Sequence, residues 1–266
     1  NLGRVAEARE QVEHALGVAL RSGYPEIAAL LTVTHALATS LLGDVTAAWE
    51  TATRGRELLE RVPLPAIVAR VVPALANVFA WAGAFDDAEA VLQQGHEAAA
   101  RAGVPRERAY IAQAAAGLLD ARGDTQRALE AYLAVLEKTR SRGLDLQRAL
   151  LAVRVGGLQV RLGRPEEART HLEEAMTLAE RAPLPAVVAE AGLWLDLLPG
   201  GNLQRAAIAW ERDAALLPVL ARLRLGLELA RRSDDERLAS AVRDLAEAHV
   251  AEAPEALREG LASRVA

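Results

Sequence analysis

The sequence contains no cysteine, a single methionine and only 3% aromatic residues. Without cysteine, the chain can form neither a disulfide nor a zinc site with thiolate ligands. With so few aromatic residues, any hydrophobic core must be built from Ala, Leu and Val. Small core side chains allow packed helices to approach closely. Ala, Leu, Arg and Glu dominate the composition, and all four favour helices, so the sequence predicts a helical protein.

Dense blocks of Lys or Arg are also missing, and the formal net charge is −5. Proteins that bind nucleic acid usually carry a basic face, so we expect no direct nucleic-acid contact from this region. No uninterrupted apolar run reaches the ~18 residues needed to span a bilayer, and no signal peptide is recognisable. We therefore expect no membrane association and a cytoplasmic location.

Residue patterns that carry catalysis or hold a cofactor are missing as well. No two of the five histidines lie three or four positions apart, no HExxH motif occurs, and no serine lies in a nucleophile elbow. The carboxylate pairs Asp86-Asp87, Glu166-Glu167 and Asp234-Asp235 stand where helices are expected to begin, a position that favours acids. We therefore expect no enzymatic activity, no metal and no cofactor.

What the sequence does contain is one short motif, a glycine followed five positions later by an alanine, at a nearly constant interval. Its glycines are Gly3, Gly43, Gly83, Gly123, Gly163 and Gly201, which are 40, 40, 40, 40 and 38 residues apart. A second series lies 20 residues after the first and consists of Gly23, Pro63, Gly103, Gly143 and Pro183. Glycine often follows a helix end, and proline often follows a helix end or begins the next helix. Each repeat is therefore predicted to contain two helices.

One stretch of the array is duplicated almost unchanged. Residues 60–69 (ERVPLPAIVA) return as residues 180–189 (ERAPLPAVVA), 120 residues further along the chain. This separation equals three repeat lengths, which supports a repeat of 40 residues.

The turns of the array resemble those of the tetratricopeptide repeat, whose second helix follows a Gly-Asp-like turn and has a small residue five positions after the glycine. Gly43-Asp44 and Gly123-Asp124 carry this pattern. The family's small residue in the first helix, seven positions before the glycine, matches the column Ala36, Ala76, Ala116 and Gly156. The family repeat has about 34 residues, so this longer repeat implies longer helices. In this it resembles the repeats of large bacterial transcription activators of the maltose-regulator and antibiotic-regulator types.

The resemblance implies an all-α fold, a right-handed α-solenoid of tetratricopeptide-like helix-turn-helix repeats. We expect the array to cover residues 1–216, and an atypical repeat with a capping helix to cover 217–266 within the same superhelix. The small residues would mark where the two helices of a repeat cross.

Both ends of the array are predicted to be irregular. Leu2-Gly3 looks like the tail of a helix whose body is missing, so we expect the chain to be a piece of a longer protein. Near the other end, a helix is expected to run to about Leu217 and Pro218 to open the next. Ser233 is predicted to cap a further helix, with Glu236 as its capping-box partner, and Pro254 to begin the last helix, which would end near Val265. A link into a further domain is the alternative for this region.

In the family, the first helices of the repeats line a concave surface that binds partners, and its positions transfer by repeat column. The polar and aromatic residues in these columns are Arg70, Asn77, Trp81, Tyr110, Gln113, Asp120 and Arg161. Trp, Tyr and Arg are frequent at binding hot spots, and arginine can bind a carboxylate through two hydrogen bonds. The alternative for Trp81 is that it fills the core between repeats.

The sequence therefore predicts a binding module, the sensor or interaction region of a larger bacterial regulatory protein such as a transcription activator. Its partner would be a protein segment or a small-molecule effector in the concave groove. The alternative is an assembly scaffold that binds no small ligand and forms a homodimer through one end or its convex face.

Overall fold

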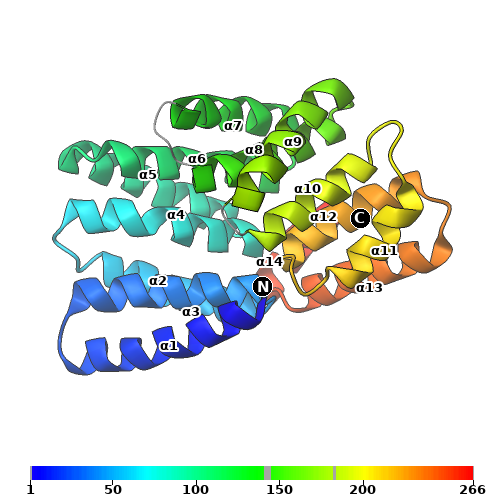
Figure 1. Cartoon of the computed structure of the whole chain (residues 1–266). Coiled ribbons are helices and arrows are strands. Elements are labelled where there is room, and N and C mark those ends of the chain that lie inside the picture. The colour runs from blue at the N-terminus through cyan, green and yellow to red at the C-terminus, as the bar shows by residue number, and fades with distance from the viewer. Residues whose placement is uncertain (1, 141–144, 182–183, 266) are drawn as a thin grey trace. The chain divides into compact units, whose positions relative to one another are not determined.

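The computed structural model describes residues 2–140, 145–181 and 184–265, which form fourteen α-helices with no β-strand among them (Figure 1). The helices are α1 (Leu2–Arg21), α2 (Pro25–Leu41), α3 (Val45–Leu59), α4 (Pro65–Ala82), α5 (Phe85–Ala102), α6 (Pro105–Ala121), α7 (Thr125–Arg140), α8 (Asp145–Arg161), α9 (Pro165–Arg181), α10 (Pro185–Asp196), α11 (Leu203–Arg212), α12 (Val219–Arg232), α13 (Glu236–Ala251) and α14 (Glu255–Val265). The predicted all-α fold is confirmed.

The helices follow the predicted alternation of first and second helices in each repeat. α1 is the second helix of a leading half repeat, and the pairs α2/α3 to α10/α11 follow it. Within these pairs α2 packs on α3, α4 on α5 and α8 on α9. One detail of the prediction was wrong. Leu2 and Gly3 lie inside α1, so they are not the tail of an earlier helix.

The turns between the two helices of a repeat are closed by glycines with a left-handed backbone, which residues with a Cβ rarely adopt. The predicted glycines with this conformation are Gly43, Gly83, Gly123 and Gly163, with φ of 97°, 84°, 83° and 69°. Where aspartate follows, it caps the next helix: the Asp44 carboxylate accepts a hydrogen bond from the Ala47 N–H at 3.0 Å. The glycine thus ends the first helix, and the aspartate caps the start of the second.

The turn before α11 departs from this pattern. Its left-handed residue is Gly200, with φ of 79°, and not the predicted Gly201. Gly201 lies so close to the Asp196 backbone that a Cβ would overlap the carbonyl group. In the second series of helix-ending residues, Gly23 and Gly103 also have positive φ, whereas Gly143 and Pro183 fall outside the described residues.

The predicted columns of small residues are buried where the helices of a pair meet. In the second helices the residues are Ala48, Ala88, Ala128, Ala168 and Ala206, each at most 1% exposed. In the first helix α8, a Cβ on Gly156 would lie 2.5 Å from Cγ of Leu172 on α9. A larger residue in these columns would separate the two helices, because interhelical spacing depends on the side chains at the contact.

Internal contacts divide the chain into two compact units. The first unit contains Gly3–Gly123 together with the segment from His249 onward, and the second contains Asp124–Ala248. Each unit has a core of small and aliphatic residues, which includes Phe79 in the first unit and Trp194 and Trp210 in the second. The predicted boundary between an array over 1–216 and a cap over 217–266 stays a prediction.

The segment from His249 onward completes the first unit from the far end of the sequence. Ala253 and Leu261 pack with Val45 and Ala82, near the turns that follow α2 and α4. The Thr46 hydroxyl also donates a hydrogen bond to the backbone carbonyl of Glu252. The last helix thus covers two turns that lie about 200 residues earlier in the chain.

Two details of the C-terminal prediction were wrong. α11 ends at Arg212 rather than near Leu217, and a turn leads to Pro218, which precedes α12 as predicted. The capping residue of α13 is Asp235 rather than Ser233, because the Asp235 carboxylate accepts from the N–H groups of residues 237 and 238, at 3.0 and 3.2 Å. Ser233 instead accepts a hydrogen bond from the Asp235 N–H. The last helix follows Pro254 as predicted.

α4 is the one described helix that is long and apolar enough to cross a bilayer, with a mean hydropathy of 1.5. Arg70 and Asn77 interrupt its apolar run. More than half of the helix (56%) is buried inside the protein, where it packs against α2, α5 and α6. Burial to this extent is the environment of a core helix.

Candidate binding sites

One face of α4 remains accessible although the rest of the helix is buried. Between Val68 and Ala82, the residues that are not buried are Arg70, Pro73, Ala74, Asn77 and Trp81. Their spacing of three to four residues places them in a single stripe along the helix. The predicted binding residues of α4 therefore lie together on the face that the core does not cover.

The neighbouring first helices extend this stripe sideways within the first unit. α2 and α6 both pack against α4 (Figure 1). Residues of α2 and α6 that remain at least partly accessible in the matching columns include Leu30, Leu37, Tyr110, Gln113 and Gly117. We call the surface formed by Leu30, Leu37, Arg70, Asn77, Trp81, Tyr110 and Gln113 the first-helix face.

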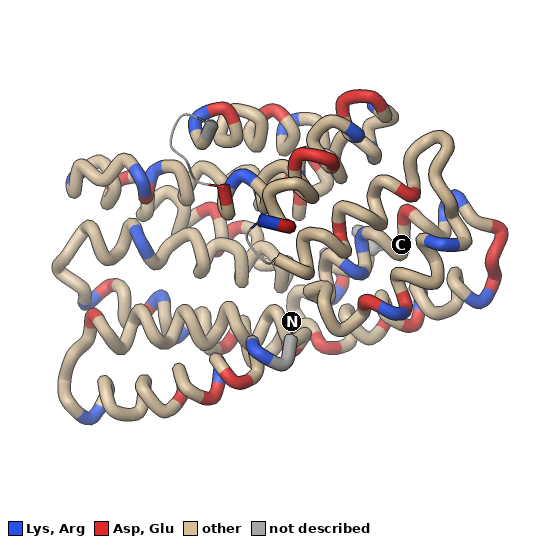
Figure 2. The backbone as a smooth tube through the Cα atoms, in the orientation of Figure 1, with Lys and Arg blue, Asp and Glu red and all other residues tan. Residues whose placement is uncertain are grey.

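Arg70 is the charged residue among those that form the first-helix face. α4 has no charged residue other than Arg70, and in Figure 2 its tube is almost entirely tan. The Arg70 side chain is exposed, and among the described residues it has no hydrogen-bond or ion-pair partner. On α6, the Arg106 guanidinium lies 5.8 Å from the centre of the Tyr110 ring. The face therefore offers a free guanidinium beside apolar and aromatic groups.

Two of the predicted residues lie away from this face. Asp120, at the end of α6, is only 6% exposed, so its carboxylate is almost inaccessible to a partner. Arg161 belongs to α8 in the second unit, where it donates a hydrogen bond to the Thr125 hydroxyl at 3.0 Å. The structure thus brings Arg70, Asn77, Trp81, Tyr110 and Gln113 together and leaves these two apart, and their role in binding stays a prediction.

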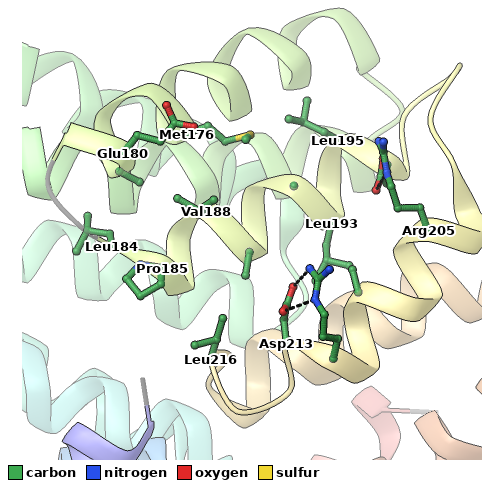
Figure 3. Close-up of a pocket in the computed structure, with 16 residues that line it drawn as sticks. Met176, Glu180, Leu184, Pro185, Val188, Leu193, Leu195, Arg205, Asp213 and Leu216 are labelled. Atoms are coloured by element: carbon green, nitrogen blue, oxygen red, sulfur yellow. Dashed lines mark hydrogen bonds and ion pairs between the residues drawn. The ribbon is translucent and has the colours of Figure 1, made fainter.

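The second unit contains a cavity that the sequence did not predict. Its volume is about 800 Å³, and it lies between α9, α10, α11 and the turn after α11 (Figure 3). Its apolar lining includes Met176, Leu184, Val188, Leu193, Leu195 and Leu216. The 38-residue interval before Gly201 is a signal in the sequence that this repeat differs from the others. No helix-ending residue directly follows Arg212, so the sequence does not reveal how short α11 is.

Charged residues at the edge of the cavity are mostly paired with one another. Arg205 donates two hydrogen bonds to Asp196, and its Nε lies 2.8 Å from Oδ2. Arg212 binds Asp213 in the same two-pronged way, at 2.8 and 2.7 Å, and this lowers the pKa of the Asp213 carboxyl. Glu180, which also lines the cavity, has no such partner among the described residues.

Neither site has the composition of a metal centre. Among the described residues, no group of three or more His, Cys, Asp or Glu side chains lies close enough together to hold a metal ion.

No protein-family model and no curated protein sequence matches the chain significantly. Solved structures do. The crystal structure of a Rap protein complexed with Competence and Sporulation Factor is 18% identical with a TM-score of 0.63, over 89% of this chain and 73% of that one. A signal transduction ATPase with numerous domains and a tetratricopeptide repeat sensor, from Pyrococcus horikoshii, is 14% identical with a TM-score of 0.52. The match covers 98% of this chain and 46% of that one. At these identities the likeness shows the fold, which is a tetratricopeptide-like helical repeat array.

Proposed function

We propose that the chain is a binding module that recognises a protein segment through the first-helix face. The observation that carries the proposal is the stripe on α4, where Arg70 and Trp81 stay accessible on a helix whose other faces are buried. A free arginine can bind a carboxylate of the partner through two hydrogen bonds, and an aromatic ring can anchor an apolar side chain beside it. Arg70 and Trp81 are separated by roughly 16 Å along α4, so the preferred ligand is an extended segment with an acidic and an apolar residue about five positions apart.

The same module would act as the sensor or interaction region of a larger bacterial regulatory protein, such as a transcription activator. Two similar folds support this role. One is a Rap protein bound to Competence and Sporulation Factor, and the other is the repeat sensor of a multidomain signalling ATPase. The chain spans less than half of that ATPase, so the activity of any attached domain is part of the proposal.

A peptide display library selected on the whole chain tests the proposed binding. We expect enriched peptides to combine an acidic with an apolar residue, and Arg70→Glu to weaken their binding at least about tenfold. A charge-assisted hydrogen bond contributes roughly 1.5–3 kcal/mol, and about 1.4 kcal/mol corresponds to tenfold. Trp81→Ala should weaken binding to a similar extent.

Arg108→Glu is the matched control for the charge reversal. Arg108 is an exposed arginine on α6, two residues before Tyr110 and therefore on another side of the helix. Peptides that bind the Arg70→Glu and Trp81→Ala variants as well as they bind the original chain would contradict the proposal. A failure to enrich any peptide would contradict it too and favour the assembly scaffold.

A further inference from the structure

The duplicated stretch provides an internal comparison for the cavity of the second unit. α4 and α10 begin at equivalent prolines, Pro65 and Pro185, within nearly identical sequences. Val68 and Ala69 on α4 are buried, at 6% and 0% exposed. Their counterparts Val188 and Ala189 on α10 are only half-buried, although the residues are the same.

The difference arises from the helix that should cover them. α5 continues for 18 residues to Ala102, whereas α11 ends after 10 residues at Arg212. In the first copy, Gly95 of α5 packs so closely on Val72 that a Cβ would lie 2.6 Å from Cγ1 of the valine. Counted from the first residues of the two helices, Phe85 and Leu203, the position equivalent to Gly95 falls just beyond the end of α11. The half of α5 that covers α4 thus has no helical counterpart over α10.

The residue of α10 that corresponds to Val72 enlarges this opening further, because it is Gly192. A Cβ on Gly192 would have no neighbouring atom within 4 Å. Other glycines inside helices, such as Gly55, Gly95 and Gly157, have a neighbour within 2.6 to 2.8 Å of a Cβ, so close packing explains them. Glycine inside a helix is unfavourable relative to alanine, and it is the usual choice where a ligand approaches the backbone.

We propose that the cavity over Gly192 binds a small molecule with an apolar body and a hydrogen-bond-donating group such as an amine. Its volume of about 800 Å³ lies in the range of roughly 300–1,000 Å³ that is typical of small-molecule sites. The apolar body would pack on Val188, Leu193 and Gly192. The Arg205 and Arg212 guanidinium groups already bind aspartates, so the unpaired charge of the lining is the Glu180 carboxylate, which favours a donor or a cation over an anion.

This site is separate from the first-helix face, and the inference does not depend on the proposed function. A peptide bound at α4 and a small molecule bound at α10 would be two independent events. Loss of peptide binding in the Arg70→Glu variant would therefore leave the cavity unaffected.

The probe for the cavity is 1-aminoanthracene, a fluorescent apolar amine, added to the whole chain. We expect saturable binding with one molecule per chain and a blue-shifted emission. 4-Phenylbutylamine should displace the probe at least about tenfold more effectively than 4-phenylbutyrate, which has the same apolar body and the opposite charge. In the Glu180→Gln variant this preference should fall to about twofold or less.

Substitutions at Gly192 test the location of the site. Gly192→Leu should fill the floor of the cavity and weaken probe binding at least about tenfold. Gly192→Ala adds a single methyl group in open space. We expect this smaller substitution to leave the fold intact, so it tests the location of the site in a folded chain. Ser240→Leu, at an exposed position of α13 outside the cavity, is the control for an added apolar side chain and should leave binding unchanged.

Three results would overturn the proposal. They are the absence of saturable probe binding, unchanged binding in both Gly192 variants with their melting temperatures retained, and equal displacement by the amine and the carboxylate. Stronger displacement by the carboxylate would equally contradict the role of Glu180.

Discussion

The indole ring of Trp194 on α10 lies directly over Gly157 on α8. A Cβ on Gly157 would lie 2.8 Å from Cε2 and 2.9 Å from Nε1 of that ring, closer than real Cβ atoms approach another atom. Trp194 is 3% exposed and belongs to the core of the second unit, so the ring has little room to move away. The contact explains why Gly157 occurs inside α8, next to Gly156, which packs on Leu172.

We expect Gly157→Ala to destabilise the protein although alanine is the better helix former. Overpacking of a well-filled core costs about 1–3 kcal/mol, which exceeds the gain of roughly 0.5–1 kcal/mol from replacing a glycine inside a helix. The free energy of unfolding from urea denaturation measures the net effect.

Gly192→Ala is the matched control, because it makes the same change inside α10, where a Cβ meets nothing within 4 Å. Only the helix gain applies there, so this variant should be more stable by about 0.5–1 kcal/mol. If both substitutions shift the free energy of unfolding in the same direction, the packing at Gly157 is not as described.

A leucine at Ala168 should destabilise the protein by about 1–3 kcal/mol. Ala168 is fully buried where α9 crosses α8, and its carbonyl oxygen lies 3.4 Å from the position of a Cβ on Gly156. Thr177→Leu, at an exposed position of the same helix, should change stability little. A melting temperature that is unchanged in Ala168→Leu would contradict the close crossing of the two helices.

The cap of α13 can be tested by comparing two adjacent candidates. Asp235→Ala removes a carboxylate that accepts two backbone N–H groups at the start of the helix, and we expect a loss of about 0.5–2 kcal/mol. Ser233→Ala removes a hydroxyl that accepts only the Asp235 N–H and should cost less. Thermal unfolding of both variants gives the order, and a larger loss for Ser233→Ala would restore serine as the capping residue.

Stability should fall as the pH decreases below about 6.5, the ordinary pKa of histidine. His249 is 5% exposed, its ring nitrogens have no hydrogen-bond partner among the described residues, and burial lowers its pKa. The unfolded chain therefore binds a proton at a higher pH than the folded chain does. The stability that is present above pH 6.5 is lost as the pH falls toward the folded pKa, by at most about 1.4 kcal/mol per pH unit.

Urea denaturation at pH 7.5 and 5.5 measures this loss, and His249→Leu should reduce it. Burial also lowers the pKa of His35, and the nearby Glu13 opposes this effect. A smaller loss of the same sign should therefore remain in the variant. An identical loss in the original chain and in His249→Leu would exclude His249 as the source.

The repeat and its turns could be predicted because they depend on local properties. Gly43 and Gly83 stand out since few other residues adopt a positive φ, and the small residues recur wherever two helices must cross. The end of α11 could not be predicted, because Leu216 and Leu217 continue its apolar pattern and no glycine marks the stop. The cap of α13 was ambiguous because Ser233 and Asp235 can both accept backbone N–H groups.

The predicted binding residues of α4 were placed on an accessible face because the repeat column fixes the face of the helix. Asp120 was assigned to the groove by the same rule, but its column is also buried at Ala80, so the column is a poor guide to exposure. The cavity over Gly192 depends on a helix that is too short to cover its neighbour. Such an absence is visible only when the two copies of the duplicated stretch are compared in three dimensions.

The contact between α14 and the turns after α2 and α4 delays the completion of these turns during synthesis. The Thr46 hydroxyl bonds to a carbonyl that lies 206 residues later. At roughly 5–20 residues per second, a ribosome needs about 10–40 s to make the intervening chain. Throughout that interval Val45 lacks the contact with Ala253 that covers it in the folded protein. Repeat arrays can usually fold repeat by repeat along the chain, but here the repeats that contain Val45 and Ala82 are completed by a segment made long after them.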